Sequence, residues 1–183
     1  FTATADKTTR LDILEKIFNQ EAKTLIKGFD RPNLSLSIVQ KTNWKSQIIE
    51  FISDRKFQPG IIYCISRNKT EEVATLLNQN GYKASAYHAG LDNEEKIKLE
   101  QQLIDNEIDV LIATSALSMG FDKPDLGFVY HFQTPQSVVH YYQQVGRAGR
   151  AIPQAFGTCL LGKEDEDIVN FFIKEAYPKR EDM

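Results

Sequence analysis

The chain has 183 residues, of which 42% are hydrophobic and 26% charged, and its formal net charge is −3. This size and composition suit one globular domain with a short extension. The slightly acidic balance argues against a protein that coats nucleic acid with its whole surface, because such proteins are usually basic. Any contact with nucleic acid is therefore expected to come from a local patch.

The first half of the chain shows short β-rich runs that alternate with helical patterns from Leu34 onward. Three strands and three helices are expected there, in this order: Leu34–Val39, Lys45–Arg55, Gly60–Ile65, Arg67–Gln79, Ala84–Tyr87 and a helix from Asn93. Asp92–Glu95 fits a capping box, in which an acid caps the helix and a Glu follows three residues later. Asn80-Gly81 supplies a left-handed stop to the preceding helix.

The second half continues the alternation. Three strands are expected at Asp109–Ala113, Phe128–Phe132 and Gly157–Leu161, with helices from Thr134-Pro135 and from about Asp165. Proline suits the first turn of a helix because its missing N–H is not needed there. The strands are too apolar to show a one-sided pattern, which predicts an α/β fold with a mostly parallel sheet and helices on both faces.

Polar side chains directly follow four of these strands. They are Ser66-Arg67, His88–Leu91, Thr114-Ser115 and Gln133-Thr134. Ligands of parallel sheets bind outside the carboxyl ends of the strands. We therefore expect these groups to gather at one edge of the sheet and to form a site there.

The two cysteines, Cys64 and Cys159, each lie in an apolar run and have no Cys-x-x-Cys partner. They cannot form a structural zinc site, and no metal is expected to be held by this chain. Both are interpreted as small core residues in a reducing compartment, which indicates the cytoplasm, or the nucleoid of a bacterium. No run approaches the about 20 apolar residues of a membrane span, so no membrane partner is expected.

The strongest motif is the octet Gln143–Arg150, Gln-Gln-Val-Gly-Arg-Ala-Gly-Arg. Gly146 and Gly149 permit unusual dihedral angles, so we predict a helix end that breaks into a tight turn and projects both guanidiniums. Arginine forks bind phosphate oxygens with two parallel hydrogen bonds and stay charged at any working pH. An isolated Gly-Arg pair is more often a solvated helix end, whereas the full octet after a βα unit favours phosphate binding.

The octet resembles motif VI of superfamily 2 helicases, and Tyr142-Gln143 resembles the RecQ form in particular. Other segments resemble RecQ motifs in the same order: Phe1–Asp6 (motif III), Phe29–Asn33 (the start of the second motor lobe), Gly60–Arg67 (motif IV), Tyr87–Leu91 (the segment after it) and Ala113–Pro124 (motif V). The resemblance covers nearly the whole chain. It implies a RecA-like three-layer α/β sandwich that forms the second lobe of an ATP-dependent DNA helicase with 3′→5′ polarity.

The same resemblance divides the chain into three parts. Residues 1–28 are expected to be the trailing end of the first motor lobe and a connector, residues 29–162 the second lobe, and residues 163–183 a linking helix toward a further region. Phe1–Asp6 has neither an initiator Met nor a basic leader, which indicates the middle of a longer protein. The partners implied are single-stranded or junction DNA and the first lobe of the same polypeptide.

Residue roles also follow from the resemblance. Arg150 is expected to be the arginine finger that reaches the γ-phosphate of ATP, Arg147 to contact phosphate beside it, and Gln143 to couple the nucleotide cleft to DNA. Gly120 and Asp122 are expected near the nucleotide ribose. Contacts with the DNA backbone are expected at Ser66, Arg67, His88, Thr114 and Ser115. An arginine supplied across a cleft can raise the rate by about 10³–10⁵, or about 4–7 kcal/mol of barrier.

One segment imitates a phosphate-binding loop. Gly157–Glu164 spells Gly-x-x-x-x-Gly-Lys, but its middle is an apolar strand, and Glu164 stands where Ser or Thr would hold Mg²⁺. The acids Glu164–Asp167 are interpreted as favourable charges at a helix start. We therefore expect ATP and Mg²⁺ to be bound mainly by a first lobe, and the 183-residue chain alone to hydrolyse no ATP.

Two other functions stay open from the residues alone. One is a non-catalytic RecA-like module that binds nucleic acid or a partner, and the other is an RNA helicase or translocase of the same superfamily. Among the remaining side chains, Trp44 is interpreted as a packing residue, Tyr141-Tyr142 as core or rim, and His88 and His131 as polar groups at strand ends.

Overall fold

The computed structural model describes residues 7–18, 22, 31–56, 58–117 and 120–165. The chain divides into two compact units, Phe1–Pro32 and Asn33–Met183. In the first unit, helix α1 (Lys7–Phe18) has no buried residue. The motif III-like segment Phe1–Asp6 lies outside the described residues, as does nearly all of the predicted linking helix.

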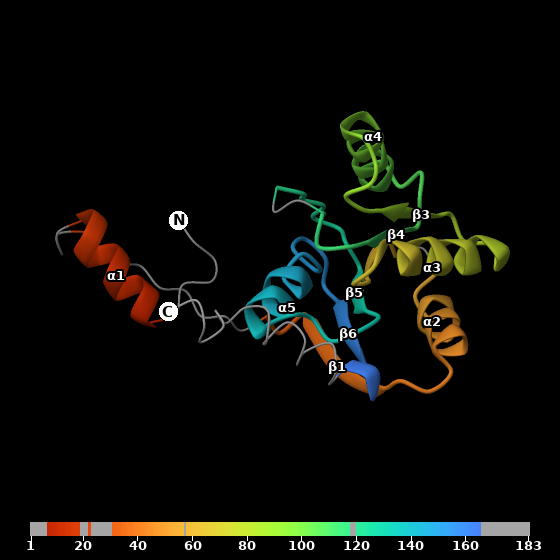
Figure 1. The fold of residues 1–183 in the computed structure, drawn as a ribbon, viewed down its shortest axis with the longest axis horizontal. Helices are drawn as coiled ribbons and strands as arrows, with labels where there is room; N and C mark the ends of the chain where they lie inside the picture. Colours follow the sequence, from red (N-terminus) through yellow and green to blue (C-terminus); the bar gives the residue numbers. More distant parts are fainter. Residues whose placement is uncertain (1–6, 19–21, 23–30, 57, 118–119, 166–183) are drawn as a thin grey trace, which may run out of the picture. The chain divides into compact units, whose positions relative to one another are not determined.

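The second unit is a parallel sheet with helices between its strands (Figure 1). In chain order its elements are β1 (Leu34–Gln40), α2 (Trp44–Ser53), β2 (Gly60–Tyr63), α3 (Arg67–Gln79), β3 (Ala84–Tyr87), α4 (Asn93–Ile104), β4 (Val110–Ala113), β5 (Phe128–His131), α5 (Val138–Val145) and β6 (Ala155–Leu161). The six strands are ordered β1-β6-β5-β2-β4-β3, and every neighbouring pair is parallel. The predicted α/β architecture is confirmed.

Two hydrophobic clusters lie on opposite faces of this sheet, because successive strand residues point to opposite sides. Ile62 and Ile112 pack with residues of α2 and α3, whereas their neighbours Ile61 and Leu111 pack with residues of α4 and α5. Both faces of the central strands are therefore covered, which explains why these strands are apolar at every position. Cys64 and Cys159 are both buried and free, as expected of small core residues.

The edge strand β1 differs from the central strands. It pairs with β6 on one side, and the first six residue pairs run from Leu34↔Ala155 to Val39↔Leu160. Leu36 and Ile38 are 57% and 73% exposed. Among the described residues, this edge of the sheet is thus the least covered part of its apolar surface.

Local signals fixed several helix ends as predicted. The Asp92 side chain accepts the Glu95 amide at 2.8 Å, which confirms the cap of α4. Gly81 has a φ of 84°, which confirms the left-handed stop after α3. Gly157–Leu161 lies within β6, so the segment that imitates a phosphate loop is a strand through most of its length.

One predicted helix start was wrong. The helix expected from Thr134-Pro135 begins at Val138, because Ser137 adopts an extended conformation and its hydroxyl accepts the amide of His140. The Thr134 hydroxyl instead donates to Asp165, at 3.2 Å. No helix among the described residues is long and apolar enough to cross a membrane.

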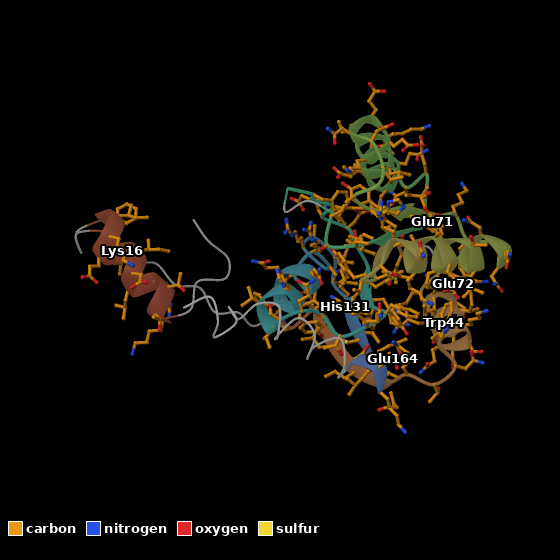
Figure 2. All side chains as sticks on the ribbon, viewed as in Figure 1. Lys16, Trp44, Glu71, Glu72, His131 and Glu164 are labelled. Carbon is orange, nitrogen blue, oxygen red and sulfur yellow. The ribbon has the colours of Figure 1, made fainter. Side chains whose placement is uncertain are left out.

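Trp44, at the start of α2, packs as predicted (Figure 2). Its ring meets Phe132 edge-on with centroids 5.1 Å apart, and it contacts the cluster beneath α2 and α3. Lys69 lies over both rings, at 4.9 Å from Trp44 and 5.2 Å from Phe132. The tryptophan therefore joins the starts of α2 and α3 to the carboxyl end of β5.

Candidate functional site

The polar clusters that follow the strands gather at one edge, as predicted. The backbone hydrogen bonds between neighbouring strands continue just past the strand ends. The Thr114 amide donates to the Tyr87 carbonyl at 3.0 Å, and the Cys64 amide donates to the Ala113 carbonyl at 2.9 Å. The Gln133 side chain accepts the Ile65 amide at 3.2 Å. These bonds align the segments after β2, β3, β4 and β5 at the carboxyl edge.

The glycine-rich octet forms a turn after α5. The helix ends at Val145, and Gly146 follows with an ordinary right-handed φ of −63°. Gly149 has a φ of 71°, a conformation that side-chain-bearing residues rarely adopt. The predicted break is therefore confirmed at Gly149 alone, and the unusual dihedral angle expected at Gly146 is wrong.

Arg150 projects from this turn. Its side chain is 44% exposed, and its Nη1 lies 2.8 Å from Oδ1 of Asp122, whose side chain is 55% exposed. The structure therefore brings together two residues expected at the nucleotide. Gly120, two residues before Asp122, is exposed as well.

Arg147 does not project, which corrects the expectation that both guanidiniums do. It is 9% exposed, and its Nη1 donates to the carbonyl of Phe121 at 2.9 Å. In the turn that follows α5, the Arg147 amide donates to the Gln144 carbonyl at 3.2 Å. Burial raises the pKa of Tyr63 to about 12, and the charge of Arg147 opposes that rise. Arg147 therefore lies close to the core.

The octet turn and the preceding Gly120–Gly127 loop form one bonded unit. The Gly149 amide donates to Leu126 and the Ala151 amide to Pro124, each at 2.8 Å. The ammonium of Lys123, which is 2% exposed, anchors the same loop. It contacts the Ile104 carbonyl at 3.1 Å, Asn106 at 2.9 Å and Asp125 at 3.0 Å.

The five predicted DNA contacts divide by exposure. Ser66, Arg67 and Ser115 are exposed, whereas His88 and Thr114 are buried. Ser66 also caps α3 by accepting the Lys69 amide at 3.3 Å.

His88 is bonded within the domain at both ring nitrogens. Nε2 lies 2.9 Å from Glu71, and Nδ1 accepts the Gly90 amide at 3.2 Å. A side chain at Gly90 would come within 2.6 Å of the Arg67 guanidinium, so the glycine leaves room for Arg67 to lie across the loop. His88 is thus placed to position the segment beside Arg67, rather than to reach a ligand from the surface.

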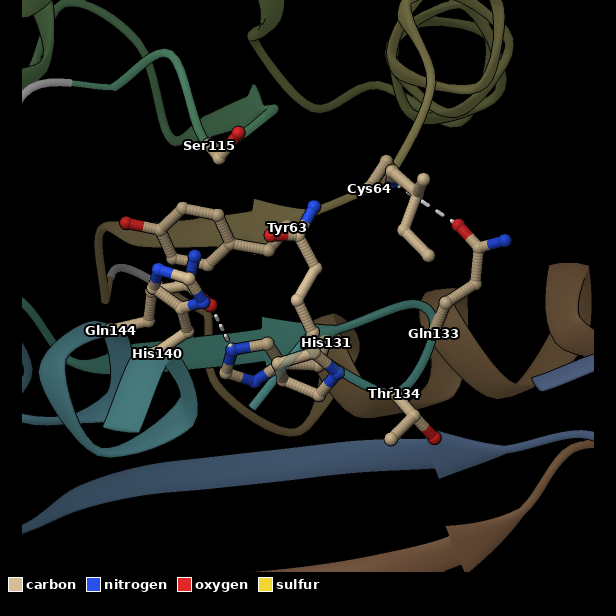
Figure 3. A pocket seen from close by; sticks show the side chains of 11 residues that line it. Tyr63, Cys64, Ser115, His131, Gln133, Thr134, His140 and Gln144 are labelled. Atoms are coloured by element: carbon tan, nitrogen blue, oxygen red, sulfur yellow. Dashed lines mark hydrogen bonds between the residues drawn. The ribbon is translucent and has the colours of Figure 1, made fainter. Parts of the chain in front are cut away.

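A pocket lies at the carboxyl ends of β2 and β5, at the edge where the polar clusters were expected to form a site (Figure 3). His131 lies at its floor, stacked on Tyr63 with centroids 5.4 Å apart and bonded to Gln144 at 2.8 Å. Burial lowers the pKa of His131 to about 4, so the ring is neutral at pH 7. Ser115 and Gln133 belong to the same lining. His131 was predicted as a polar group at a strand end, but its bond to Gln144 of α5 was not predicted.

Gln143, the first residue of the octet, is half-buried on α5. Among the described residues, no cluster of three or more His, Cys, Asp or Glu side chains could hold a metal ion.

Comparison with known proteins shows the family of this chain. Residues 40–152 match the model of the helicase conserved C-terminal domain. The chain belongs to that family. This helicase C-terminal domain is 42% identical to the ATP-dependent DNA helicase RecQ of Pasteurella multocida (strain Pm70), over 149 residues that cover 81% of the chain and 24% of that protein. It is 40% identical over 151 residues to the ATP-dependent helicase SGS1 of Saccharomyces cerevisiae, covering 81% of the chain and 10% of that protein.

The helicase C-terminal domain also matches solved structures. Its fold superposes on S. cerevisiae dbp5 l327v bound to gle1 h337r and ip6, with a TM-score of 0.73 and 20% identity over 96% of this chain and 46% of that one. That similarity confirms the RecA-like α/β fold, and the relatives confirm the resemblance to RecQ. The domain spans about a quarter or less of the length of the two curated relatives.

Proposed function

We propose that this domain is the second motor lobe of a RecQ-like ATP-dependent DNA helicase, and that Arg150 is its arginine finger. The observation that carries the proposal is the half-exposed guanidinium of Arg150 on a turn held firmly by the neighbouring loop. Its ion pair with Asp122 is exposed, and such pairs contribute only about 0–1 kcal/mol. A phosphate group can therefore take the place of the carboxylate at little cost.

The proposed partner of Arg150 is ATP with Mg²⁺, bound mainly by a first motor lobe of the same polypeptide. Negative charge is spread over the phosphoryl oxygens during transfer, and a fixed guanidinium stabilises that charge. Arg150 would supply this charge, while Asp122 and Gly120 would lie toward the ribose. Arg147 would support the nucleotide site from within, since it ties the turn to Phe121. A direct contact of Arg147 with phosphate would need its side chain to move outward.

DNA is the proposed nucleic acid, translocated with 3′→5′ polarity as the RecQ resemblance implies. Ser66, Arg67 and Ser115 are exposed at the carboxyl edge and would contact the phosphate backbone. Most hydrogen bonds between proteins and DNA go to phosphate and sugar, and arginine is well suited to them. His88 and Thr114 would act indirectly, by holding the adjacent loops.

The test is Arg150→Ala in the intact protein. DNA-stimulated ATP hydrolysis should fall by about 10³-fold or more, while the binding of a fluorescent ATP analogue stays largely unchanged. Arg150→Lys keeps the charge without the fork and should recover only part of the rate. Lys16→Ala, which removes an exposed ion pair with Asp12 on α1, serves as a control that leaves turnover unchanged.

Unchanged turnover in the Arg150→Ala variant would remove Arg150 from catalysis. Stimulation by RNA in place of single-stranded DNA would favour an RNA helicase or translocase. If the intact protein bound nucleic acid but hydrolysed no ATP, the non-catalytic module would be the better explanation.

A further inference from the structure

Asn33 makes two long-range hydrogen bonds to the turn that carries Arg150. Its Nδ2 donates to the carbonyl of Gly149 at 2.7 Å and to the carbonyl of Ile152 at 2.9 Å. These two carbonyls lie on either side of Arg150 in the chain. Because both partners are acceptors, the amide nitrogen of Asn33, and not its oxygen, must face them.

The position of Asn33 is fixed by the sheet. Its carbonyl accepts the Ala155 amide at 2.8 Å, and the next residue, Leu34, begins the paired register of β1 with β6. The asparagine therefore stands at the amino end of a seven-residue parallel pairing, where the backbone has little freedom. Its short side chain reaches the turn from this fixed point.

The opposite side of the same turn is held by the loop before β5. The amides of Gly149 and Ala151, which flank Arg150, donate to Leu126 and Pro124. Two carbonyls of the turn thus bond to Asn33, and two of its amides bond to the loop. The main chain around Arg150 is thus bonded from two sides, while the Arg150 side chain stays exposed.

We infer that Asn33 is a positioning residue, which acts through the main chain of residues 149–152 to aim the Arg150 guanidinium at the nucleotide. This inference rests on the proposed role of Arg150. Phosphoryl transfer depends on placement, and an error of about 1 Å can lower the rate by about 10²-fold. Loss of the Asn33 amide would leave two carbonyls without their donor and would loosen one side of the turn.

The experiment compares Asn33→Ala and Asn33→Asp in the intact protein. Asn33→Asp keeps the volume of the side chain but cannot donate when ionised. Both variants should lower kcat for DNA-stimulated ATP hydrolysis by about 10–100-fold, with KM for ATP changed by less than about 3-fold. All variants are assayed at a temperature at which circular dichroism shows them to be folded.

Asn78→Ala is the matched control. The Asn78 amide also donates to two backbone carbonyls, of Ala74 at 2.9 Å and of Ala84 at 2.8 Å, and joins α3 to β3. Asn78 Oδ1 also accepts the Ala84 amide at 3.1 Å, so this variant loses three backbone bonds. It should therefore lose at least as much thermal stability as Asn33→Ala, yet keep its kcat. A kcat loss in Asn78→Ala equal to that in Asn33→Ala would overturn the inference.

A double variant separates this inference from the proposed function. If Asn33 acts through Arg150, adding Asn33→Ala to Arg150→Ala should cause no further loss of kcat. Additive losses would show that Asn33 acts by another route. If Arg150→Ala itself left turnover unchanged, the arginine-finger proposal would fail first. If both Asn33 variants were unfolded at every temperature while Asn78→Ala folded, Asn33 would serve the whole domain and the inference would be overturned.

Discussion

The guanidinium of Arg150 lies 2.8 Å from the carboxylate of Asp122, although the two residues belong to different loops. The contact links the loop before β5 to the turn after α5 at the surface. A buried counterpart lies beneath it, where Arg147 donates to Phe121, the residue before Asp122. The two arginines of the octet therefore bind adjacent residues of one loop, one arginine from outside and one from within.

The exposed member of this pair should matter little for folding. Asp122→Ala in the 183-residue chain should change the free energy of unfolding by less than about 1 kcal/mol, because both side chains are about half in solvent and screened by salt. Urea titration followed by circular dichroism measures this value. The adjacent Lys123→Ala provides the contrast.

Lys123→Ala should cost about 2–3 kcal/mol, because it removes a side chain that is 2% exposed together with its bonds to the Ile104 carbonyl and the Asn106 side chain, and opens a cavity. A loss for Asp122→Ala as large as that for Lys123→Ala would mean that the surface pair is a structural bond after all. A phosphate group could then not replace the Asp122 carboxylate at Arg150 at little cost in free energy.

The pH dependence of stability should carry a contribution from His131. Its pKa of about 4 in the folded chain lies below the ordinary value of 6.5, so below pH 6.5 the unfolded chain takes up a proton that the folded chain does not. Stability should therefore decrease as the pH falls from about 6.5 to about 4, by about 3 kcal/mol in total, and this contribution should level off below that range.

His131→Phe keeps a ring against Tyr63 but has no titrating nitrogen. Its free energy of unfolding, measured in urea between pH 7 and pH 4, should show a shallower slope than that of the unsubstituted chain. Equal slopes would show that protonating His131 costs no more free energy in the folded chain than in the unfolded chain. The surroundings of His131 would then be open to water.

Arg67 should contribute to DNA affinity by neutralising phosphate. Arg67→Ala should weaken single-stranded DNA binding by the intact protein about 10-fold and reduce the slope of log K against log salt concentration by about 0.7–1. Fluorescence anisotropy over a range of salt concentrations gives both quantities. Lys83→Ala removes an exposed charge at the amino edge of the sheet, before β3, and should leave the slope unchanged. A change of slope in Lys83→Ala alone would place the DNA on the opposite edge.

The 183-residue chain by itself should hydrolyse no ATP. The segment that imitates a phosphate loop lies mostly in β6, where its backbone amides are engaged by the sheet. Phosphate release can be measured with and without single-stranded DNA, beside Arg150→Ala of the same chain. Turnover that disappeared in the Arg150→Ala chain would contradict this expectation, whereas turnover that persisted in it would come from a contaminating enzyme.

Much of the fold followed from local sequence patterns. The bounds of α3 and β3 were predicted to the residue, because Ser66, Gly81 and the short apolar run of β3 are local signals. The start of α5 was missed, since both Pro135 and Ser137 are good starting residues and only the tertiary structure selects between them. Strands alternate with helices so regularly that the parallel sheet could be predicted from their order alone.

The candidate site was less predictable, because its bonds join residues far apart in the chain. The octet identified Arg147 and Arg150, but nothing local to it indicates that Arg147 turns inward to Phe121. The bonds of Asn33 span 116 and 119 residues and depend on the pairing of β1 with β6. Neither hydrophobic periodicity nor motif spacing in a sequence predicts a hydrogen bond between residues so far apart in the chain.

The pairing of the first strand with the last has a consequence for where this domain can be cut. A fragment that starts at Leu34 would retain all six strands and both cores, and would pass most tests of folding. It would nevertheless lack the Asn33 side chain, which donates to the carbonyls of residues 149 and 152. A domain that is cut at the first strand would therefore fold, but it would lack the residue that we infer to position the Arg150 guanidinium.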